Sequence, residues 1–339
     1  MTTSYESTSQ AKTGYSHHMQ LEYQTTLLAN EPIAITIGNF DGVHRGHQRL
    51  MHELVLQARE LDCKPVLVTF SPHTSMVVRP DTDHQYLTTL EEKLALARRY
   101  GHINNSVVVH FTPEVMQMSA EDFMDSLLTH FAIRGITVGS NFSLGHHRMG
   151  NVAFLEQYCQ QHERVLRSIA LEEAEQTRIS STRIRALVGE GQVSEANDLL
   201  GYPVTFSGLV VHGDHRGRLL GFPTANLAPE PHKLLPANGV YAARVTVGTS
   251  AELERDSSSV FPVYKGVVNI GVRPTFQGQE RRVEAHLLDV DLELYDQRIT
   301  IDFIARLREE QRFSGIEALK AQISTDVQQA RRVLVVTSA

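Results

Sequence analysis

The hydrophobic pattern of this 339-residue chain changes type near its middle, and this change limits the folds open to it. In the first half, short apolar runs rich in β-branched residues alternate with segments of helical periodicity. The expected strands are 33–37, 65–70, 106–111 and 135–139. Between the first two runs, one helix face is marked by Leu50, Leu54, Ala58 and Leu61. Strands separated by helices predict a parallel sheet covered on both faces, which binds ligands at the carboxyl ends of its strands.

The second half contains strand patterns with no helical pattern between them. The expected strands are 204–213, 239–248, 264–272, 282–290 and 297–307. Consecutive strands of this kind predict an antiparallel sheet or a small barrel. Apolar residues at helical spacing from Ile316 to Leu334 then predict one long helix at the end of the chain.

These patterns divide the chain into two domains, as its length also suggests. Residues 1–20 are polar, lack the apolar core of a secretory signal and are expected to be a disordered tail. The α/β domain is placed at 21–186, a linker at 187–202 and the second domain at 203–339.

Composition excludes several classes of protein. The formal net charge is −7, which argues against nucleic-acid binding, because that needs a basic surface to displace counterions. No apolar run approaches the roughly 18 residues that a membrane span needs. Two cysteines, Cys63 and Cys159, are too few for a disulfide framework or a cysteine-based zinc site and fit a reducing compartment. The expected location is the cytoplasm.

The segment from Gly38 to His47, GNFDGVHRGH, follows the first predicted strand and precedes a helix. A loop in this position directs backbone N–H groups and the positive helix end toward a bound anion. Gly46 would let a phosphate approach the backbone, and His44 and His47 could hydrogen-bond its oxygens. A surface turn with two solvated histidines and a metal-binding pair are the alternatives. The strand–loop–helix context favours nucleotide phosphate binding.

A second motif, RISSTRIR, begins at Arg178 and ends at Arg185. Ser181 or Thr182 could cap the helical segment that follows. Hydroxyl groups at a helix start, with two arginines nearby, could equally form a second phosphate clamp.

The second half holds two more candidates. In the turn GFPTAN, the side-chain oxygens of Thr224 and Asn226 could hold a hard cation such as Mg²⁺, although an ordinary hairpin turn is the simpler interpretation. Just upstream, Arg216 opens a short Arg-Gly-Arg loop that could fold over phosphates. Glu284 lies in an apolar strand, where pairing with Arg281 or Arg282 is the alternative to a catalytic role.

Taken together, these motifs resemble known families. The H-x-G-H and I-S-S-T-x-I-R pair resembles the nucleotidyltransferase superfamily, in which it binds ATP phosphates. The longer forms TIGNFDGVHRGHQ and RISSTRIR resemble the bacterial bifunctional riboflavin kinase/FAD synthetase family. Four further segments match the kinase module of that family in order: GDHRGRLLGFPTAN (213–226), NIGVRPTF (269–276), VEAHLLD (283–289) and LREEQRF (307–313). The resemblance runs from about Ile33 to Arg331.

The resemblance implies a Rossmann-like nucleotidyltransferase domain followed by a six-stranded antiparallel barrel with a C-terminal helix. It implies phosphorylation of riboflavin by ATP to FMN, then adenylylation of FMN to FAD, with Mg²⁺ as cofactor. Only small molecules are expected as substrates, and flavin-requiring apoproteins as recipients of FAD. The implied catalytic residues are Glu284, His44 and His47, and the implied metal ligands are Thr224 and Asn226. The implied substrate-binding residues are Gly38, Asn39, Phe40, Gly46, Phe70, His73, Asn141, Arg178, Ser180, Ser181, Thr182, Arg185, Arg216, Gly221, Asn269, Arg273 and Arg308.

The first half departs from the family pattern in places. FSPHT (70–74) stands where FEPHP is usual, and Val77 and Val78 stand where an aromatic pair often stacks on the flavin ring. Ser143 and Leu144 replace a common Arg and Phe. A lost ring contact costs on the order of 1 kcal/mol. The changes bear on flavin affinity more than on phosphate chemistry, and they leave a riboflavin kinase with an impaired adenylyltransferase domain as the alternative.

Overall fold

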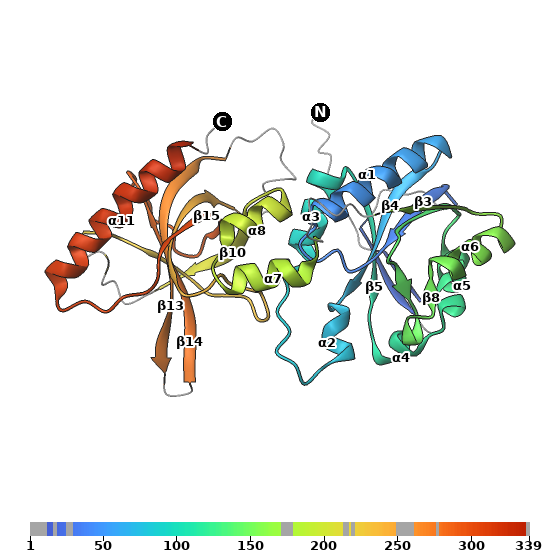
Figure 1. Cartoon of the computed structure of the whole chain (residues 1–339), viewed down its shortest axis with the longest axis horizontal. Coiled ribbons are helices and arrows are strands. Elements are labelled where there is room, and N and C mark those ends of the chain that lie inside the picture. Colours follow the sequence, from blue (N-terminus) through green and yellow to red (C-terminus); the bar gives the residue numbers. More distant parts are fainter. Residues whose placement is uncertain are drawn as a thin grey trace, which may run out of the picture. The chain divides into compact units, whose positions relative to one another are not determined.

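The chain forms two compact units in the computed structural model (Figure 1). The model describes residues 12–15, 19–24, 30–170, 179–212, 217, 221–248, 261–275 and 278–336. The first unit consists of Met1–His84 and Lys93–Arg178, and the second of Gln85–Glu92 and Ile179–Ala339. The chain therefore passes into the second unit and returns before it finally leaves the first.

A seven-stranded sheet forms the centre of the first unit, in the order β1-β2-β5-β4-β3-β6-β9. Its parallel strands are β3 (Ile33–Ile37), β4 (Lys64–Ser71), β5 (Asn105–His110), β6 (Ile133–Gly139) and β9 (Val165–Ile169). This confirms the predicted parallel sheet.

Helices cover this sheet and bury its apolar side chains. They are α1 (Arg45–Glu60), α2 (Thr74–Val78), α3 (Leu90–Gly101), α4 (Pro113–Gln117), α5 (Ala120–His130) and α6 (Val152–Gln161). The buried face of α1 includes Leu50, Leu54 and Ala58, as the spacing predicts, whereas Leu61 is the residue that ends the helix. Short strands β7 (Ser143–Leu144) and β8 (Gly150–Asn151) flank the 3-10 turn η1 (His146–Arg148).

The strand order fixes where this unit can bind a ligand. Along the chain the parallel strands run β3, β4, β5, β6, β9, but β3 lies at their centre, between β4 and β6. The connections therefore reverse direction between β3 and β6, and open α/β sheets bind ligands where such a reversal leaves a crevice at the carboxyl ends. The loop after β3 begins with Gly38 and ends with His44, the first histidine of the H-x-G-H motif, and His47 lies in the first turn of α1.

Of the expected disordered tail 1–20, the structure describes residues 12–15, 19 and 20, and strands formed there join the sheet. Strand β1 (Lys12–Tyr15) pairs antiparallel with β2 (Gln20–Gln24), which extends the sheet by pairing with β5. Met19 and Leu21 are almost completely buried in the core cluster of the first unit. Burial of these two apolar side chains explains why the segment joins the sheet.

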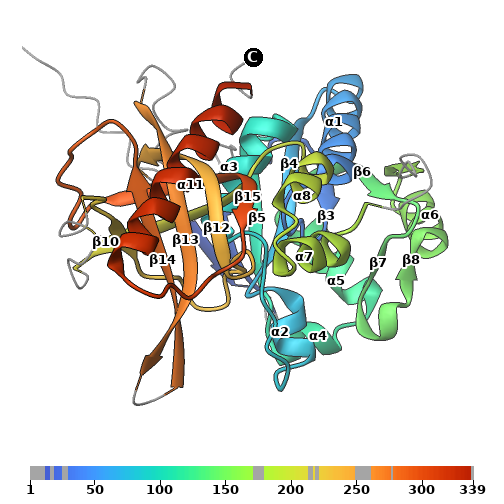
Figure 2. The ribbon, with the colours of Figure 1, turned by 60° about the vertical axis from the view of Figure 1, so that its left-hand side comes forward.

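The second unit is a closed antiparallel barrel of six strands. In spatial order they are β10 (Val204–Val211), β11 (Ala225–Leu227), β14 (Gly278–Leu287), β13 (Val263–Thr275), β12 (Gly239–Val247) and β15 (Arg298–Arg308). The last helix, α11 (Ile316–Val336), lies across β12 and β13 on the outside of the barrel (Figure 2). Its Ala330 and Leu334 pack against Val240 and Ala242 of β12. The barrel and the C-terminal helix confirm the predicted fold class.

The residues expected to be a linker, 187–202, are largely helical. Helices α7 (Ser181–Gly189) and α8 (Val193–Leu200) occupy this part of the chain. The Asn197 side chain donates to the Phe303 carbonyl and accepts from the Val204 amide, which ties α8 to the barrel. The division between the units therefore lies at 178/179, because both helices pack with the barrel unit.

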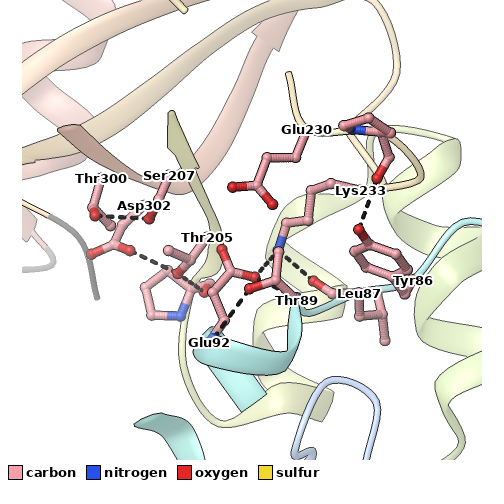
Figure 3. A network of polar contacts seen from close by, with 12 residues as sticks. Tyr86, Leu87, Thr89, Glu92, Thr205, Ser207, Glu230, Lys233, Thr300 and Asp302 are labelled. Carbon is pink, nitrogen blue, oxygen red and sulfur yellow. Dashed lines mark hydrogen bonds and ion pairs between the residues drawn. The ribbon is translucent and has the colours of Figure 1, made fainter. Parts of the chain in front are cut away.

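The segment Gln85–Glu92, called the strap below, is held in the second unit by a buried polar network (Figure 3). The Lys233 ammonium lies 2.5 Å from a Glu92 carboxylate oxygen and donates to the Leu87 carbonyl at 2.6 Å. The same Glu92 oxygen accepts from the Thr89 amide, and the Thr89 hydroxyl accepts from the Glu92 amide. This reciprocal pair is a capping box at the start of α3, and the lysine completes it.

Candidate functional site

The loop of residues 38–44, which joins β3 to α1, has an unusual backbone. Phe40, Gly42 and Val43 all have positive φ angles, of 49°, 79° and 31°. Two of these residues carry a Cβ, so the loop stores local strain that the surrounding structure must hold in place. Strain of this kind concentrates at functional sites, because a strained loop has a defined shape before any ligand arrives.

The rings of His44, at the end of the loop, and His47, in the first turn of α1, stack on each other. His44 is the N-cap residue, and its Nδ1 accepts a hydrogen bond from the His47 amide at 3.3 Å. The two imidazole rings are nearly parallel, with centroids 3.6 Å apart, and the Phe40 ring meets the His47 ring edge-on. A Cβ on Gly46 would lie 3.3 Å from the His44 ring, so glycine fits this position best.

Both imidazoles are neutral at pH 7. Burial lowers the pKa of His44 to about 4, against smaller opposing effects of a backbone hydrogen bond and of Asp41. Burial also lowers the pKa of His47 well below its usual value, and the charges of His44 and Lys93 add to this effect. The His47 Nδ1 is buried and lacks a hydrogen-bond partner among the described residues. A neutral ring can donate one N–H to a phosphate oxygen.

Two charged residues are buried here, Asp41 in the loop and Lys93 on α3, and neither is among the site residues predicted from the sequence. Asp41 is 2% exposed and Lys93 4%. The Lys93 ammonium donates to the Thr69 hydroxyl at 3.2 Å and to the Phe70 carbonyl at 3.4 Å. The signal that could have found Lys93 is its position on α3, on the same face as Leu90, Leu94 and Ala97.

Residues expected near the flavin are placed at the same sheet edge, with local partners of their own. The Phe70 ring packs edge-on against Phe111, 5.5 Å away, at the border of the core. His73 caps α2 through its Nδ1, which accepts from the Ser75 amide at 3.2 Å. The Asn39 side chain donates to the Thr74 hydroxyl at 2.8 Å and so joins the 38–44 loop to α2.

Two positions near the predicted flavin site carry exposed side chains. Asn141 is exposed in the turn after β6. Val78, which stands where an aromatic residue is common in the family, is 52% exposed. A small aliphatic side chain at this position offers less surface for stacking than a ring would.

The second phosphate motif forms the start of α7, in the second unit. Ser180, and not Ser181 or Thr182, is the N-cap residue, and its hydroxyl accepts from the Arg183 amide at 3.3 Å. The Arg185 guanidinium donates to the Thr182 hydroxyl at 3.3 Å. Arg178 lies outside the described residues. The helix start and an arginine are thus placed together, as a phosphate clamp requires.

In the barrel, strand register brings three polar residues into one row. Glu284 on β14 pairs with Asn226 on β11 and with Asn269 on β13. Their strand neighbours Val283 and Ala285 are completely buried on the opposite face of the sheet. Because side chains alternate along a strand, the carboxylate and two amides share one side of the barrel wall.

The turn before β11 is shaped by glycine and held by a histidine. Gly221 has φ 86°, which favours glycine. The His286 ring, from β14, hydrogen-bonds the Pro223 carbonyl through Nδ1 at 2.7 Å. A Cβ on Gly217 would lie 2.4 Å from the Phe222 carbonyl oxygen and 3.1 Å from the Thr224 hydroxyl, so only glycine fits beside Thr224.

A cavity of about 70 Å³ opens beside this turn. Gly217, Thr224 and Asn226 line one part of it, and Leu287 and Tyr295 line another. A hydroxyl and an amide oxygen are ligands that Mg²⁺ accepts together with phosphate oxygens and water. The residues present therefore fit a magnesium–phosphate group. Within the described residues there is no group of three or more His, Cys, Asp or Glu placed to bind a metal.

Arg308 and Arg281 have structural partners. The Arg308 guanidinium contacts both carboxylate oxygens of the buried Asp326 in α11, at 2.8 to 3.1 Å. Arg281 donates to Asn238 and to backbone carbonyls, those of Leu235 and Pro236. Arg308 thus joins α11 to β15. Of the other expected ligands, Arg216 lies outside the described residues, and Arg273 is placed only by its backbone pairing on β13.

Comparison with known proteins gives consistent matches over both halves. The FAD synthetase family model matches residues 27–183, and the riboflavin kinase family model matches residues 200–334. A bifunctional riboflavin kinase/FMN adenylyltransferase of Escherichia coli K12 is 35% identical over 302 residues, which is 89% of this chain and 92% of the relative. The Listeria monocytogenes relative of the same name is 34% identical over 94% of this chain and 97% of its own length.

One solved structure also matches most of the chain. It is a crystal structure described as a macrolide-efflux protein from Streptococcus pneumoniae, with a TM-score of 0.79 and 26% identity. The match covers 90% of this chain and 96% of that one. Among the described residues of this chain, no helix is both long enough and apolar enough to span a membrane.

Proposed function

This chain belongs to the family of bifunctional riboflavin kinases/FMN adenylyltransferases, and on that premise we propose which of its residues carry each reaction. It phosphorylates riboflavin with ATP to give FMN and ADP. It also transfers the adenylyl group of a second ATP to FMN, which gives FAD and pyrophosphate. The kinase family model lies within the barrel unit, and the FAD synthetase model covers most of the α/β unit.

We propose that adenylyl transfer takes place at the 38–44 loop. An oxygen of the FMN phosphate attacks the α-phosphorus of ATP, and pyrophosphate leaves. No protein nucleophile is needed, because FMN supplies it. His44 and His47 bind and orient the triphosphate, and stabilise the charge that develops on it. The neutral, stacked rings at the helix start are the observation that carries this assignment.

The second phosphate motif supports the same reaction. Ser180, Ser181 and Thr182 lie at the start of α7, and Arg185 is one turn further along. Backbone N–H groups of a helix start and a guanidinium together bind phosphate oxygens. We propose that these residues, with Arg178, bind phosphate oxygens in the adenylyl-transfer reaction.

We propose that Glu284 is the general base of the kinase reaction. The terminal ribityl hydroxyl of riboflavin attacks the γ-phosphorus of ATP, its proton passes to the Glu284 carboxylate, and ADP leaves. We propose that Asn226 and Asn269, the cross-strand neighbours of Glu284, orient the substrates. The row that these three residues form across the barrel wall is the observation that carries this role.

Thr224 and Asn226 are the residues that would hold Mg²⁺ in the kinase site. They line the cavity beside the glycine-shaped turn, where oxygen ligands are available. A Mg²⁺ ion held there would supply positive charge that offsets the negative charge of the phosphate groups. The tight packing of Gly217 against Thr224 fixes the position of the hydroxyl before substrates bind.

A riboflavin kinase with weak adenylyl transfer is the second candidate. The exposed Val78, in place of a stacking ring, favours weaker FMN binding in the α/β unit. The intact histidine pair favours a working transfer step. The formation of FAD from supplied FMN, ATP and Mg²⁺ distinguishes the two.

The division of the reactions is tested by two variants of the full chain. Glu284→Gln is expected to lower FMN formation by about a hundredfold or more, with FAD formation from supplied FMN retained. His44→Asn combined with His47→Asn is expected to do the reverse, with a similar loss. The matched controls are Glu317→Gln, on the exposed side of α11, and His52→Asn, exposed on α1. Loss of both reactions in a folded Glu284 or histidine variant would contradict the two-site assignment.

We also propose that FAD passes to flavin-requiring apoproteins, and that the chain works in the cytoplasm without nucleic-acid partners. The net charge of −7 argues against nucleic-acid partners, and the two unpaired cysteines fit a reducing compartment. Burial raises the pKa of the Cys159 thiol to about 11, so this thiol stays protonated and unreactive at neutral pH.

A further inference from the structure

We propose that Lys93 is a positioning residue for adenylyl transfer, which holds the 38–44 loop in its active shape from behind. The proposal rests on the function assigned above to His44 and His47. Lys93 lies in the first turn of α3 and does not belong to either phosphate motif.

Hydrogen bonds connect Lys93 to the loop through one intermediate. The ammonium donates to the Thr69 hydroxyl at 3.2 Å and to the Phe70 carbonyl at 3.4 Å, at the carboxyl end of β4. The Thr69 hydroxyl in turn donates to the Asn39 carbonyl at 3.3 Å. All these groups belong to the first unit, so the connection lies within one compact unit.

Lys93 also interacts electrostatically with a residue of the loop, Asp41. Asp41, which is also buried, acts on Lys93 in the direction that favours the ammonium form. Burial is the larger effect and lowers the pKa of Lys93 to about 8, so the side chain is mainly charged at pH 7. A buried cation is tolerated where an anion compensates it. The opposite charge of Asp41, a residue of the loop itself, therefore favours the ammonium form of Lys93.

The loop needs such support. Phe40 and Val43 have left-handed backbone angles, at positions on either side of Asp41 and Gly42. Residues in this region stay in place only when their surroundings hold them. The Lys93 charge also disfavours protonation of His47, which keeps that imidazole neutral. Both effects act on groups that contact the triphosphate, whereas Lys93 itself acts through them.

The test measures both reactions in each full-length variant. Lys93→Met keeps an unbranched side chain and removes the charge and the donor. Adenylyl transfer is expected to fall at least about tenfold in kcat, because small displacements of a positioned group cost this much or more. FMN formation by the same preparation is expected to stay within about twofold, since it depends on the other unit. Arg99→Met, which removes an exposed cation from the same helix, is the matched control and is expected to change neither rate.

A second variant separates positioning from folding. Lys93→Met removes the positive charge that acts on the buried Asp41, whereas Lys93→Met combined with Asp41→Asn removes both charges. Removing both members of a buried pair is less destabilising than removing one. The double variant is expected to regain thermal stability while its adenylyl transfer stays low, because the donor to Thr69 and Phe70 is still missing.

Two outcomes would overturn the proposal. One is a Lys93→Met enzyme that transfers adenylyl groups at the normal rate. The other is a double variant whose transfer rate recovers together with its Tm, because Lys93 would then serve folding alone. The His44→Asn/His47→Asn enzyme is assayed alongside. If that enzyme keeps full transfer activity, the assignment of the site has failed, and not only the role of Lys93.

Discussion

At the scale of single residues, burial sets the charge state of the two histidines proposed to act in adenylyl transfer. His44 is 5% exposed, and its ring is enclosed by His47 on one side. Removal from water disfavours the charged form, so the imidazole stays neutral at a pH where an exposed histidine would begin to gain a proton. In the proposed site, the neutral imidazole would therefore offer a hydrogen-bond donor to phosphate without adding a positive charge.

This lowered pKa makes folding stability depend on pH in a defined direction. The pKa of His44 is about 4 in the folded chain against 6.5 for an ordinary histidine. Between these values the unfolded chain binds the extra proton, so stability falls as the pH falls from 6.5 to about 4. The loss from this group amounts to about 3 kcal/mol and levels off below pH 4.

The measurement is a comparison of unfolding free energies across that pH range. His44→Asn keeps an N-cap side chain but cannot titrate, so the pH dependence of this variant is expected to be shallower than that of the natural chain. Carboxylates titrate in the same range in both proteins, so their contribution cancels in the difference. An equal slope in the two proteins would contradict the assignment of a buried, neutral His44.

At the scale of elements, helix α11 covers part of the outer surface of the barrel. Apolar contacts from Ala330 and Leu334 hold one part of this helix, and the Arg308–Asp326 pair holds another. Both members of this ion pair are largely buried, with side chains 15% and 3% exposed. Such a pair is destabilising when one partner is removed, because the other is left buried and unpaired.

Asp326→Ala is therefore expected to weaken the docking of α11 by about 3 kcal/mol. Hydrogen exchange of the backbone amides measures this locally, and faster exchange is expected in α11 and β12 but not in the α/β unit. Glu317→Ala is the matched control, because its pair with Lys320 on the same helix is exposed and contributes less than about 1 kcal/mol. Equal effects of the two substitutions would contradict a special role for Asp326.

The elements also show what sequence could and could not reveal. Periodicity located the parallel strands and the buried face of α1, because both depend on local spacing. It did not reveal the row of Asn226, Glu284 and Asn269, since the register of distant strands is set only when the barrel closes. Ser180 caps α7, whereas Ser181 or Thr182 was the expected cap, because the cap depends on where the backbone turns.

Arg308 shows that a sequence motif does not reveal the partner of a side chain. Its segment, LREEQRF, matches a functional motif, yet its guanidinium is engaged by Asp326. A motif identifies a segment, whereas the partner of each side chain depends on packing against an element that follows later in the chain. Lys93 shows the same limit. Its position among apolar residues of α3 can be read from the sequence, but its hydrogen bonds to Thr69 and Phe70 cannot, because they join segments far apart in the chain.

At the scale of the whole molecule, the residues assigned to the kinase reaction belong to one unit. Glu284, Thr224 and Asn226 are all in the barrel unit, while His44 and His47 are in the α/β unit. FMN is the product of one reaction and a substrate of the other. The two catalytic steps can therefore be supplied by different copies of the chain if FMN is released into solution.

An equal mixture of Glu284→Gln and His44→Asn/His47→Asn enzymes is accordingly expected to make FAD from riboflavin. Each variant alone is expected to fail, the first before FMN and the second after it. Chromatography of the flavins over time should show FMN accumulating first and FAD appearing after a lag. A mixture that accumulates FMN without FAD would contradict free exchange of the intermediate between copies.

The strap has a consequence for anyone who wishes to produce the barrel unit on its own. Because Gln85–Glu92 completes the barrel unit from within the first half, a cut after residue 178 assigns it to the wrong fragment. The shorter C-terminal product would then contain Lys233 without the acid that neutralises it. A usable dissection has to graft those eight residues onto the barrel, or replace the lysine by an apolar side chain.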